Sequence, residues 1–332
     1  MSKHIFISEF ENSQYLEGIY CIYNAQLGQT RAGKPYLKAL IRDKSGQIVA
    51  RMWNITEQQF RSLPTNGFVW LEGQTQPYQG ERQLIVQDIR AVEVAEEDLP
   101  NLLPATTKNV DEMEAQLRAV VATIEHGGLK ALLDEYLNDK ALMDSFRASP
   151  AAVSMHHAYL GGLLEHTLQL CVLADRMLPL YPKLNRDLVI AGLFLHDMAK
   201  CREMSYEYGF TYTTEGQLIG HIVLGSLWLQ RKADAAKARG GPELPREALL
   251  VLHHIILSHH GVPEFGAAKV PSTPEAIFIS RLDELDAKTQ MGIDNARPDS
   301  AATGDGVSEF TDKIWGLDTR LYRPDPLAGQ KP

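Results

Sequence analysis

The spacing of hydrophobic and polar residues changes once along this chain, near residue 92. Residues 1–92 contain short runs in which apolar and polar positions alternate, separated by turn residues, which is typical of β-strands. Residues 112–300 instead carry apolar residues every three or four positions over long stretches, which is typical of amphipathic helices. The sequence therefore predicts a β domain, a linker over 93–111, an all-helical domain and a C-terminal tail over 301–332.

The β domain is predicted to hold five strands and one short helix. The strands are expected at 16–23, 35–42, 47–53, 67–73 and 83–89, and the helix at 56–63, after the third strand. Five short strands with this helix position are typical of an OB-type barrel.

The segment at 93–111 is acidic and contains prolines, which favours a linker. Beyond it, helices are expected over 111–126, 129–142 and 154–177.

Composition limits the class of protein. The 332 residues are 44% hydrophobic and 23% charged, which excludes a disordered chain. No apolar run approaches the roughly 20 residues of a membrane span, so no membrane association is expected. Cys21, Cys171 and Cys201 form no CxxC pair, which favours the reducing cytoplasm and argues against a zinc ribbon.

The net charge of −9 argues against bulk nucleic-acid binding, but one stretch of the β domain is basic. The loop predicted at 28–34 lies where OB-type barrels hold their ligand, and it carries Arg31 and Lys34. Tyr36 and Trp53 lie in the flanking strands and are able to stack on bases. We therefore expect these four residues to bind nucleic acid. The alternative is a solvated basic loop with the two aromatic residues in the barrel core.

Histidines concentrate in the helical domain, where nine of the eleven lie between residues 156 and 260. His196 and Asp197 end an apolar run, and Lys200 follows three residues later. His166 and His221 fall on apolar helix faces. A single such histidine is more often a core residue than a ligand, but several inward histidines together with Asp197 indicate a metal site.

The ordered set of His166, His196-Asp197, His221, His259-His260 and Asp283 resembles the HD-superfamily phosphohydrolases. The sequence is similar to the YhaM-type 3′-5′ exoribonucleases at residues 156–167, 220–225, 257–261 and 309–324. The resemblance covers nearly the whole chain. It implies an OB domain joined to an HD domain, and a metal-dependent phosphodiesterase that shortens RNA, with DNA as a further substrate, from the 3′ end.

On this resemblance, two divalent ions are expected. His166, His196, Asp197 and Asp283 would hold one ion, and His221, His259 and His260 a second, with Asp197 bridging the two. Asp286, one helical turn from Asp283, is the alternative last ligand. We expect Mn²⁺, while Fe²⁺, Ni²⁺ and Zn²⁺ suit the same nitrogen and oxygen donors, and spacing does not choose among them.

Expected roles for three further residues follow from their positions near the predicted ligands. Lys200, a turn from Asp197, is expected to neutralise the phosphate or position the nucleophile. For His156 and His157, substrate contact and a structural role are equally favoured.

Two other functions stay open at this stage. The same ligands would serve a phosphohydrolase of nucleotides or cyclic dinucleotides. A nucleic-acid-binding module with an inactive HD domain is the other alternative, although every expected ligand position holds a competent residue. The expected partner is single-stranded RNA or DNA, and the oligomeric state is open, with a homo-oligomer among the options.

Overall fold

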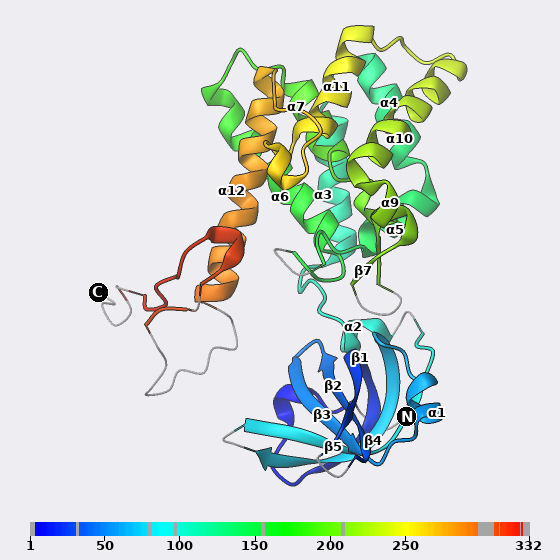
Figure 1. Ribbon diagram of the computed structural model, residues 1–332. Helices are drawn as coiled ribbons and strands as arrows, with labels where there is room; N and C mark the ends of the chain where they lie inside the picture. The colour runs from blue at the N-terminus through cyan, green and yellow to red at the C-terminus, as the bar shows by residue number, and fades with distance from the viewer. Residues whose placement is uncertain are drawn as a thin grey trace. The chain divides into compact units, whose positions relative to one another are not determined.

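The computed structural model describes residues 4–30, 33–78, 81–95, 98–153, 157–206, 210–297, 309–311, 313–325 and 327. The chain divides into two compact units (Figure 1). The first consists of Met1–Thr107 and Met204–Tyr212, and the second of Lys108–Glu203 and Thr213–Pro332.

The first unit is built on a closed five-stranded barrel. Its strands are β1 (Tyr15–Gln29), β2 (Pro35–Asp43), β3 (Gly46–Trp53), β4 (Gly67–Tyr78) and β5 (Glu81–Ala91). They follow the order β1-β2-β3-β5-β4, with β3 and β5 parallel and the other neighbours antiparallel. The helix α1 (Glu57–Arg61) follows β3. This arrangement confirms the predicted OB-type barrel.

Alternation of side chains along the strands builds the barrel core. In β2, Leu37, Ala39 and Ile41 are buried, whereas Tyr36 and Lys38 face outward. Such a period of two follows from strand geometry, since successive side chains point to opposite faces.

The first strand runs further than predicted. Gly28 and Gln29 were expected in a loop, but they pair with Tyr36 and Pro35 and complete the β1–β2 ladder. A Cβ atom on Gly28 would lie 2.7 Å from the Tyr36 ring, so the glycine leaves room for that ring. The predicted loop is therefore shorter, and Arg31 lies outside the described residues.

Part of the segment predicted as a linker packs on the barrel. The helix α2 (Leu99–Leu102) contacts β1 and β2, and Leu99, Leu102 and Leu103 are buried. The thiol of Cys21 donates a hydrogen bond to the carbonyl of Leu102. Met204–Ser205 (β6) and Thr211–Tyr212 (β7) pair as a small hairpin.

The second unit is helical, and ten α-helices form its described part. They are α3 (Val110–Ala122), α4 (Gly127–Leu137), α5 (Lys140–Ala148), α6 (Gly162–Met177), α7 (Arg186–Leu195), α8 (Lys200–Glu203), α9 (Thr214–Leu218), α10 (Gly220–Ala238), α11 (Arg246–Ser258) and α12 (Pro274–Ala296). The apolar faces of α3 to α8 and of α10 to α12 meet in one core, with Tyr136, Phe146 and Phe194 among its largest fully buried side chains. Among the described residues, no helix combines the length and apolar character needed to cross a bilayer.

Two predicted helices have different bounds in the structure. The helix expected over 129–142 is divided, because the Asp139 side chain caps the start of α5 by accepting from the amide of Leu142. The helix expected over 154–177 begins only at Gly162. Gly161 precedes it with φ of 80°, a left-handed conformation that favours glycine.

Candidate metal centre

Five helices bring the predicted ligands together, each through a residue at or near a helix end or on an inward face. The ligands are His166 on α6, His196 and Asp197 after α7, His221 at the start of α10, His259 and His260 after α11, and Asp283 on α12. Helices α6, α7, α11 and α12 pack on one another. All of these residues belong to the helical unit.

Close packing behind α7 fixes the His196-Asp197 pair. Gly192 lies one turn before His196 and faces α11 and α12. A Cβ atom there would lie 2.7 Å from Cδ1 of Ile279 and 2.9 Å from Cδ1 of Ile255. The glycine therefore lets the three helices approach closely at the point where the two polar residues emerge.

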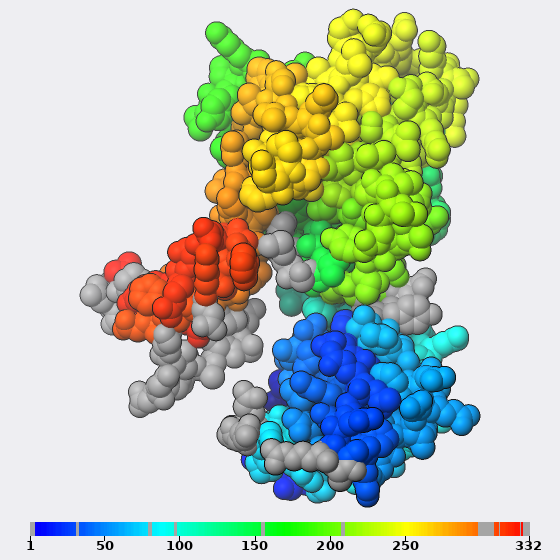
Figure 2. All heavy atoms as spheres, viewed as in Figure 1, coloured from blue at the N-terminus to red at the C-terminus, as the bar shows by residue number. Residues whose placement is uncertain are grey.

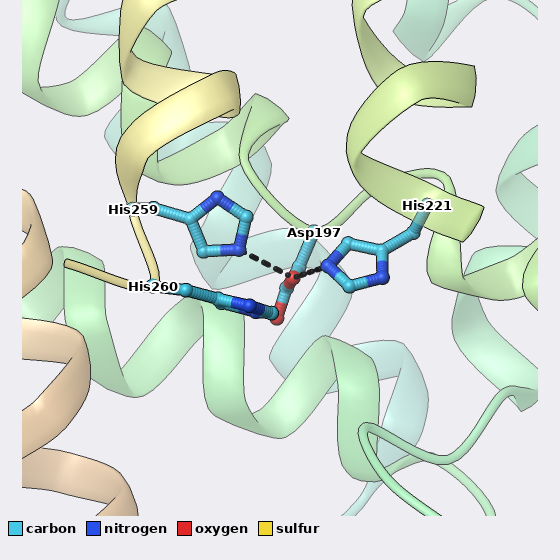
Figure 3. A group of neighbouring side chains, drawn as sticks. All are labelled: Asp197, His221, His259 and His260. Atoms are coloured by element: carbon cyan, nitrogen blue, oxygen red, sulfur yellow. Dashed lines mark ion pairs between the residues drawn. The ribbon is translucent and has the colours of Figure 1, made fainter. Parts of the chain in front are cut away.

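Asp197 lies at the middle of the histidine cluster (Figure 3). Its Oδ1 atom is 3.5 Å from Nε2 of His221 and 3.3 Å from Nε2 of His259. Its Oδ2 atom is 3.4 Å from Nε2 of His196 and 3.8 Å from Nε2 of His166. The two carboxylate oxygens therefore face two different pairs of histidines.

Every histidine of the predicted ligand set uses Nδ1 for a hydrogen bond. For three of them the partner is a backbone carbonyl, that of Leu193 for His196, Ile256 for His259 and Phe265 for His260. Since a carbonyl only accepts, these rings carry the proton on Nδ1, and Nε2 keeps its lone pair. For the other two the partner is a carboxylate, that of Asp286 for His166 and Glu203 for His221.

This arrangement suits a divalent ion. Nε2 of His196, His221 and His259 is buried and has no hydrogen-bond partner among the residues that the structure describes. A buried polar atom without a partner is costly, and a metal ion supplies the missing interaction. Asp197, His221, His259 and His260 offer ligand atoms that all lie within 4.8 Å of one another, and so do His166, His196 and Asp197.

The two candidate aspartates of α12 lie on opposite sides of His166. Oδ1 of Asp283 is 3.2 Å from Nε2, the atom that faces the cluster. Oδ2 of Asp286 is 2.9 Å from Nδ1, and its Oδ1 accepts a hydrogen bond from Gln169. Asp283 is therefore on the ligand side, and Asp286 orients the ring from behind.

Charge and burial act in opposition at the centre. Burial raises the pKa of Asp197, but the positive charge of the adjacent Lys200 opposes burial, and the pKa lies well below its usual value. Burial lowers the pKa of His166, yet its hydrogen bonds to Asp283 and Asp286 raise it to about 9. The Nζ atom of Lys200 is 2.7 Å from Oδ2 of Asp197, which makes it the cation paired with the central carboxylate.

Sequence reasoning missed two residues that contact the predicted ligands. Glu203 on α8 accepts from the backbone amide and ring of His221, and Gln169 holds Asp286; neither belongs to a recognisable sequence pattern. Substrate contact and a structural role were equally favoured for His157, which is only 1% exposed and has its Nε2 atom 3.4 Å from Oδ2 of Asp286. This burial argues for a structural role. His156 lies outside the described residues.

The barrel presents aromatic and basic residues together on its outer surface. Tyr36 and Trp53 are register partners on β2 and β3, with ring centroids 5.2 Å apart, and Trp53 is 43% exposed. Lys38 and Arg51 are the next outward-facing partners along the same two strands. Lys34 is exposed just before β2. Trp53 therefore lies on the surface and not in the barrel core.

Comparison with known proteins supports the assignment of the helical unit. The HD domain family matches residues 163–288, which include all the predicted metal ligands. The 3′-5′ exoribonuclease YhaM of Listeria monocytogenes is 31% identical over 318 residues, which cover 95% of this chain and 97% of that protein. The chain belongs to the YhaM family. YhaM of Listeria innocua shows the same identity and coverage.

Among solved structures, a chain of a replication protein A heterotrimer bound to single-stranded DNA is similar to this protein at 18% identity and a TM-score of 0.22. The similarity covers 29% of this chain and 69% of that chain. A likeness this low carries no weight, and the OB-type barrel is assigned from its own strand order.

Proposed function

We propose that this protein is a metal-dependent 3′-5′ exoribonuclease that shortens single-stranded RNA, with single-stranded DNA as a further substrate. Membership of the YhaM family makes the chain a hydrolase of phosphodiester bonds. The observation that carries the finer proposal is the position of Asp197, whose two oxygens each face a different pair of histidines.

Two ions would bind on the two sides of Asp197. His166, His196, Asp283 and Oδ2 of Asp197 would hold one. The other would be held by His221, His259, His260 and Oδ1 of Asp197. When bound, two divalent ions stabilise the attacking and leaving oxygens of an in-line displacement at phosphorus. Mn²⁺ is the expected ion, and the nitrogen and oxygen donors also suit Fe²⁺, Ni²⁺ and Zn²⁺.

The chain's own residues would hold the phosphate and fix the ligands. Lys200 lies against Asp197 and lines the cavity beside the centre, so its ammonium group places positive charge where a bound phosphate would lie. Glu203 and Asp286 keep the rings of His221 and His166 in one orientation, with Nε2 turned toward Asp197.

The barrel would hold the strand. Tyr36 and Trp53 offer adjacent aromatic surfaces on which two bases can stack, and Lys34, with Arg31, would neutralise the backbone phosphates. Stacking and phosphate contact read no particular sequence, which suits an enzyme that must advance along any RNA. All three cysteines are buried free thiols, which fits action in the cytoplasm.

The test is hydrolysis of a single-stranded RNA labelled at its 5′ end, in the presence of Mn²⁺. Wild-type protein should give a ladder of progressively shorter labelled products, and Asp197→Ala should give none. Asp144→Ala, which removes an exposed aspartate of α5 that pairs with Lys140, is the matched control and should behave like wild type. Failure of the wild type to shorten RNA with any of the four metals would contradict the proposal, and hydrolysis of nucleotides or cyclic dinucleotides instead would favour the alternative reading.

A further inference from the structure

A cavity of about 390 Å³ opens directly beside the metal centre. Lys200, His260 and Asp283 of the candidate centre line it, together with Met291 of α12 and Gly316 of the short helix η5 (Trp315–Leu317). In Figure 2 the segment that follows α11, in gold, lies against α12, in orange, and these two segments form the cavity walls. The cavity is thus continuous with the site of phosphate chemistry.

One wall of the cavity is apolar and ends in an exposed aromatic ring. Val262 and Phe265 lie on the loop after α11, and Phe265 is 65% exposed. The carbonyl of Phe265 accepts a hydrogen bond from Nδ1 of His260, 2.7 Å away. The following residue, Gly266, has φ of 97°, which turns the chain sharply at this point. The aromatic ring is therefore tied to a predicted metal ligand by a short, fixed loop.

The other wall carries a cluster of charges on α12. Oxygens of Glu284 bind Nη1 of Arg281 and Nζ of Lys288, and all three residues line the cavity. Asp283 of the same helix and Lys200 also line the cavity, so its three cations and two carboxylates leave a net charge of +1. An aromatic residue on one wall and a net positive charge over the cavity suit a ligand with both a planar base and a phosphate.

We propose that this cavity is the subsite for the 3′-terminal nucleotide of the strand, with Phe265 stacking on its base. The inference rests on the proposed function and adds to it a location and a contact for the residue that is removed. With the scissile phosphate at the metal centre, the attached terminal nucleoside extends along α12 between Phe265 and the charged cluster. The volume lies at the lower end of the roughly 300–1,000 Å³ typical of ligand pockets, which suits a single nucleotide.

The experiment crosses a protein variant with a substrate variant. Wild type and Phe265→Ala are compared on a 5′-labelled RNA with a normal 3′-terminal base, and on the same RNA with an abasic 3′-terminal residue. Stacking of one base is worth about 1–3 kcal/mol, so Phe265→Ala should lower kcat/KM for the first removal about 5- to 150-fold on the normal RNA, mainly through KM. On the abasic RNA the two proteins should differ less than twofold, and Phe265→Trp should retain wild-type KM on the normal RNA.

The controls separate a local effect from a general one. Bound Mn²⁺ is measured for each variant to confirm an intact centre, and Leu180→Ala, which removes a similarly exposed apolar side chain elsewhere in the helical unit, should match wild type on both RNAs. An abasic residue at the penultimate position should leave the effect of Phe265→Ala in place. Equal losses on the normal and the terminally abasic RNA would overturn the subsite while leaving exonuclease activity intact. Absence of any shortening by the wild type would instead overturn the proposed function.

Discussion

Asp286 lies directly behind His166, with its Oδ2 atom 2.9 Å from Nδ1 of the imidazole ring. Both residues are buried, and Gln169 donates to the other oxygen of the carboxylate. A carboxylate in this position fixes the ring and makes Nε2 a stronger ligand, so Asp286 would act on a bound metal through His166 without facing it.

We therefore expect Asp286→Asn to weaken metal binding about 10- to 100-fold without unfolding the protein. Titration calorimetry with Mn²⁺ measures the change. Asp294→Asn is the matched control, because it removes an exposed aspartate from the same helix. Unchanged affinity in Asp286→Asn would mean that the carboxylate serves only the packing of α6 on α12.

Gly192 should not tolerate a larger side chain. The Cβ atom of Gly192→Val would collide with Ile255 and Ile279 in the fully buried core, and overpacking of this kind costs about 1–3 kcal/mol. Gly292→Val is the control, since no described segment outside the adjoining turns of α12 comes within 4 Å of a Cβ built at that position, and its stability should change by no more than about 0.5 kcal/mol. Urea unfolding followed by far-ultraviolet circular dichroism measures both. Equal stabilities of the two variants would contradict the packing at α7.

Removal of the Trp53 ring should weaken binding of single-stranded RNA by the barrel. Loss of one stacked base costs about 1–3 kcal/mol, so Trp53→Ala should raise Kd about 5- to 150-fold. Fluorescence anisotropy with a labelled oligonucleotide, in the absence of metal, isolates binding from cleavage. Tyr15→Ala, at an exposed aromatic residue of β1, should have little effect. A larger increase in Kd for Tyr15→Ala than for Trp53→Ala would indicate that the strand binds another face of the barrel.

Ionisation of Asp43 should make the stability of the barrel unit depend on pH. Burial raises the pKa of this carboxyl, but hydrogen bonds from His4, Ser45 and the amide of Ile7 outweigh burial and lower it below its ordinary 3.8. Because the pKa is lower in the folded state, the ionised carboxylate stabilises the barrel at pH values above the ordinary pKa. This stabilisation disappears as the pH falls through the lowered pKa of the folded state.

Asp43→Asn should therefore destabilise the barrel at neutral pH by about 1–3 kcal/mol, and the difference from wild type should shrink as the pH falls below 3.8. Hydrogen–deuterium exchange of barrel peptides at a series of pH values measures it. A difference that stays constant down to acid pH would mean that the ionised carboxylate contributes nothing.

The sequence predicts the fold, and it picks out the histidines that gather around Asp197, because both depend on local patterns. Alternation in β2 and β3 identifies the barrel, and polar residues at the ends of apolar helices identify where His196 and His259 emerge. It does not distinguish Asp283 from Asp286. The two lie three residues apart on one helix face, and only the position of the His166 ring decides which carboxylate meets Nε2.

Contacts between distant segments explain what else was missed. Glu203 reaches His221 because α8 packs against α10. The spacing of residues in the sequence does not reveal this contact. The position of Phe265 beside α12 likewise depends on the path of a loop. Such residues are found only when the packed helices are known.

Anomalous X-ray scattering from a crystal grown with Mn²⁺ tests most directly whether Asp197 divides the centre into two metal sites. We expect two peaks about 3.5–4 Å apart. One should lie between Oδ2 of Asp197 and His166, and the other between Oδ1 and His221. A single peak at saturating Mn²⁺, or two peaks that do not share Asp197, would contradict this account.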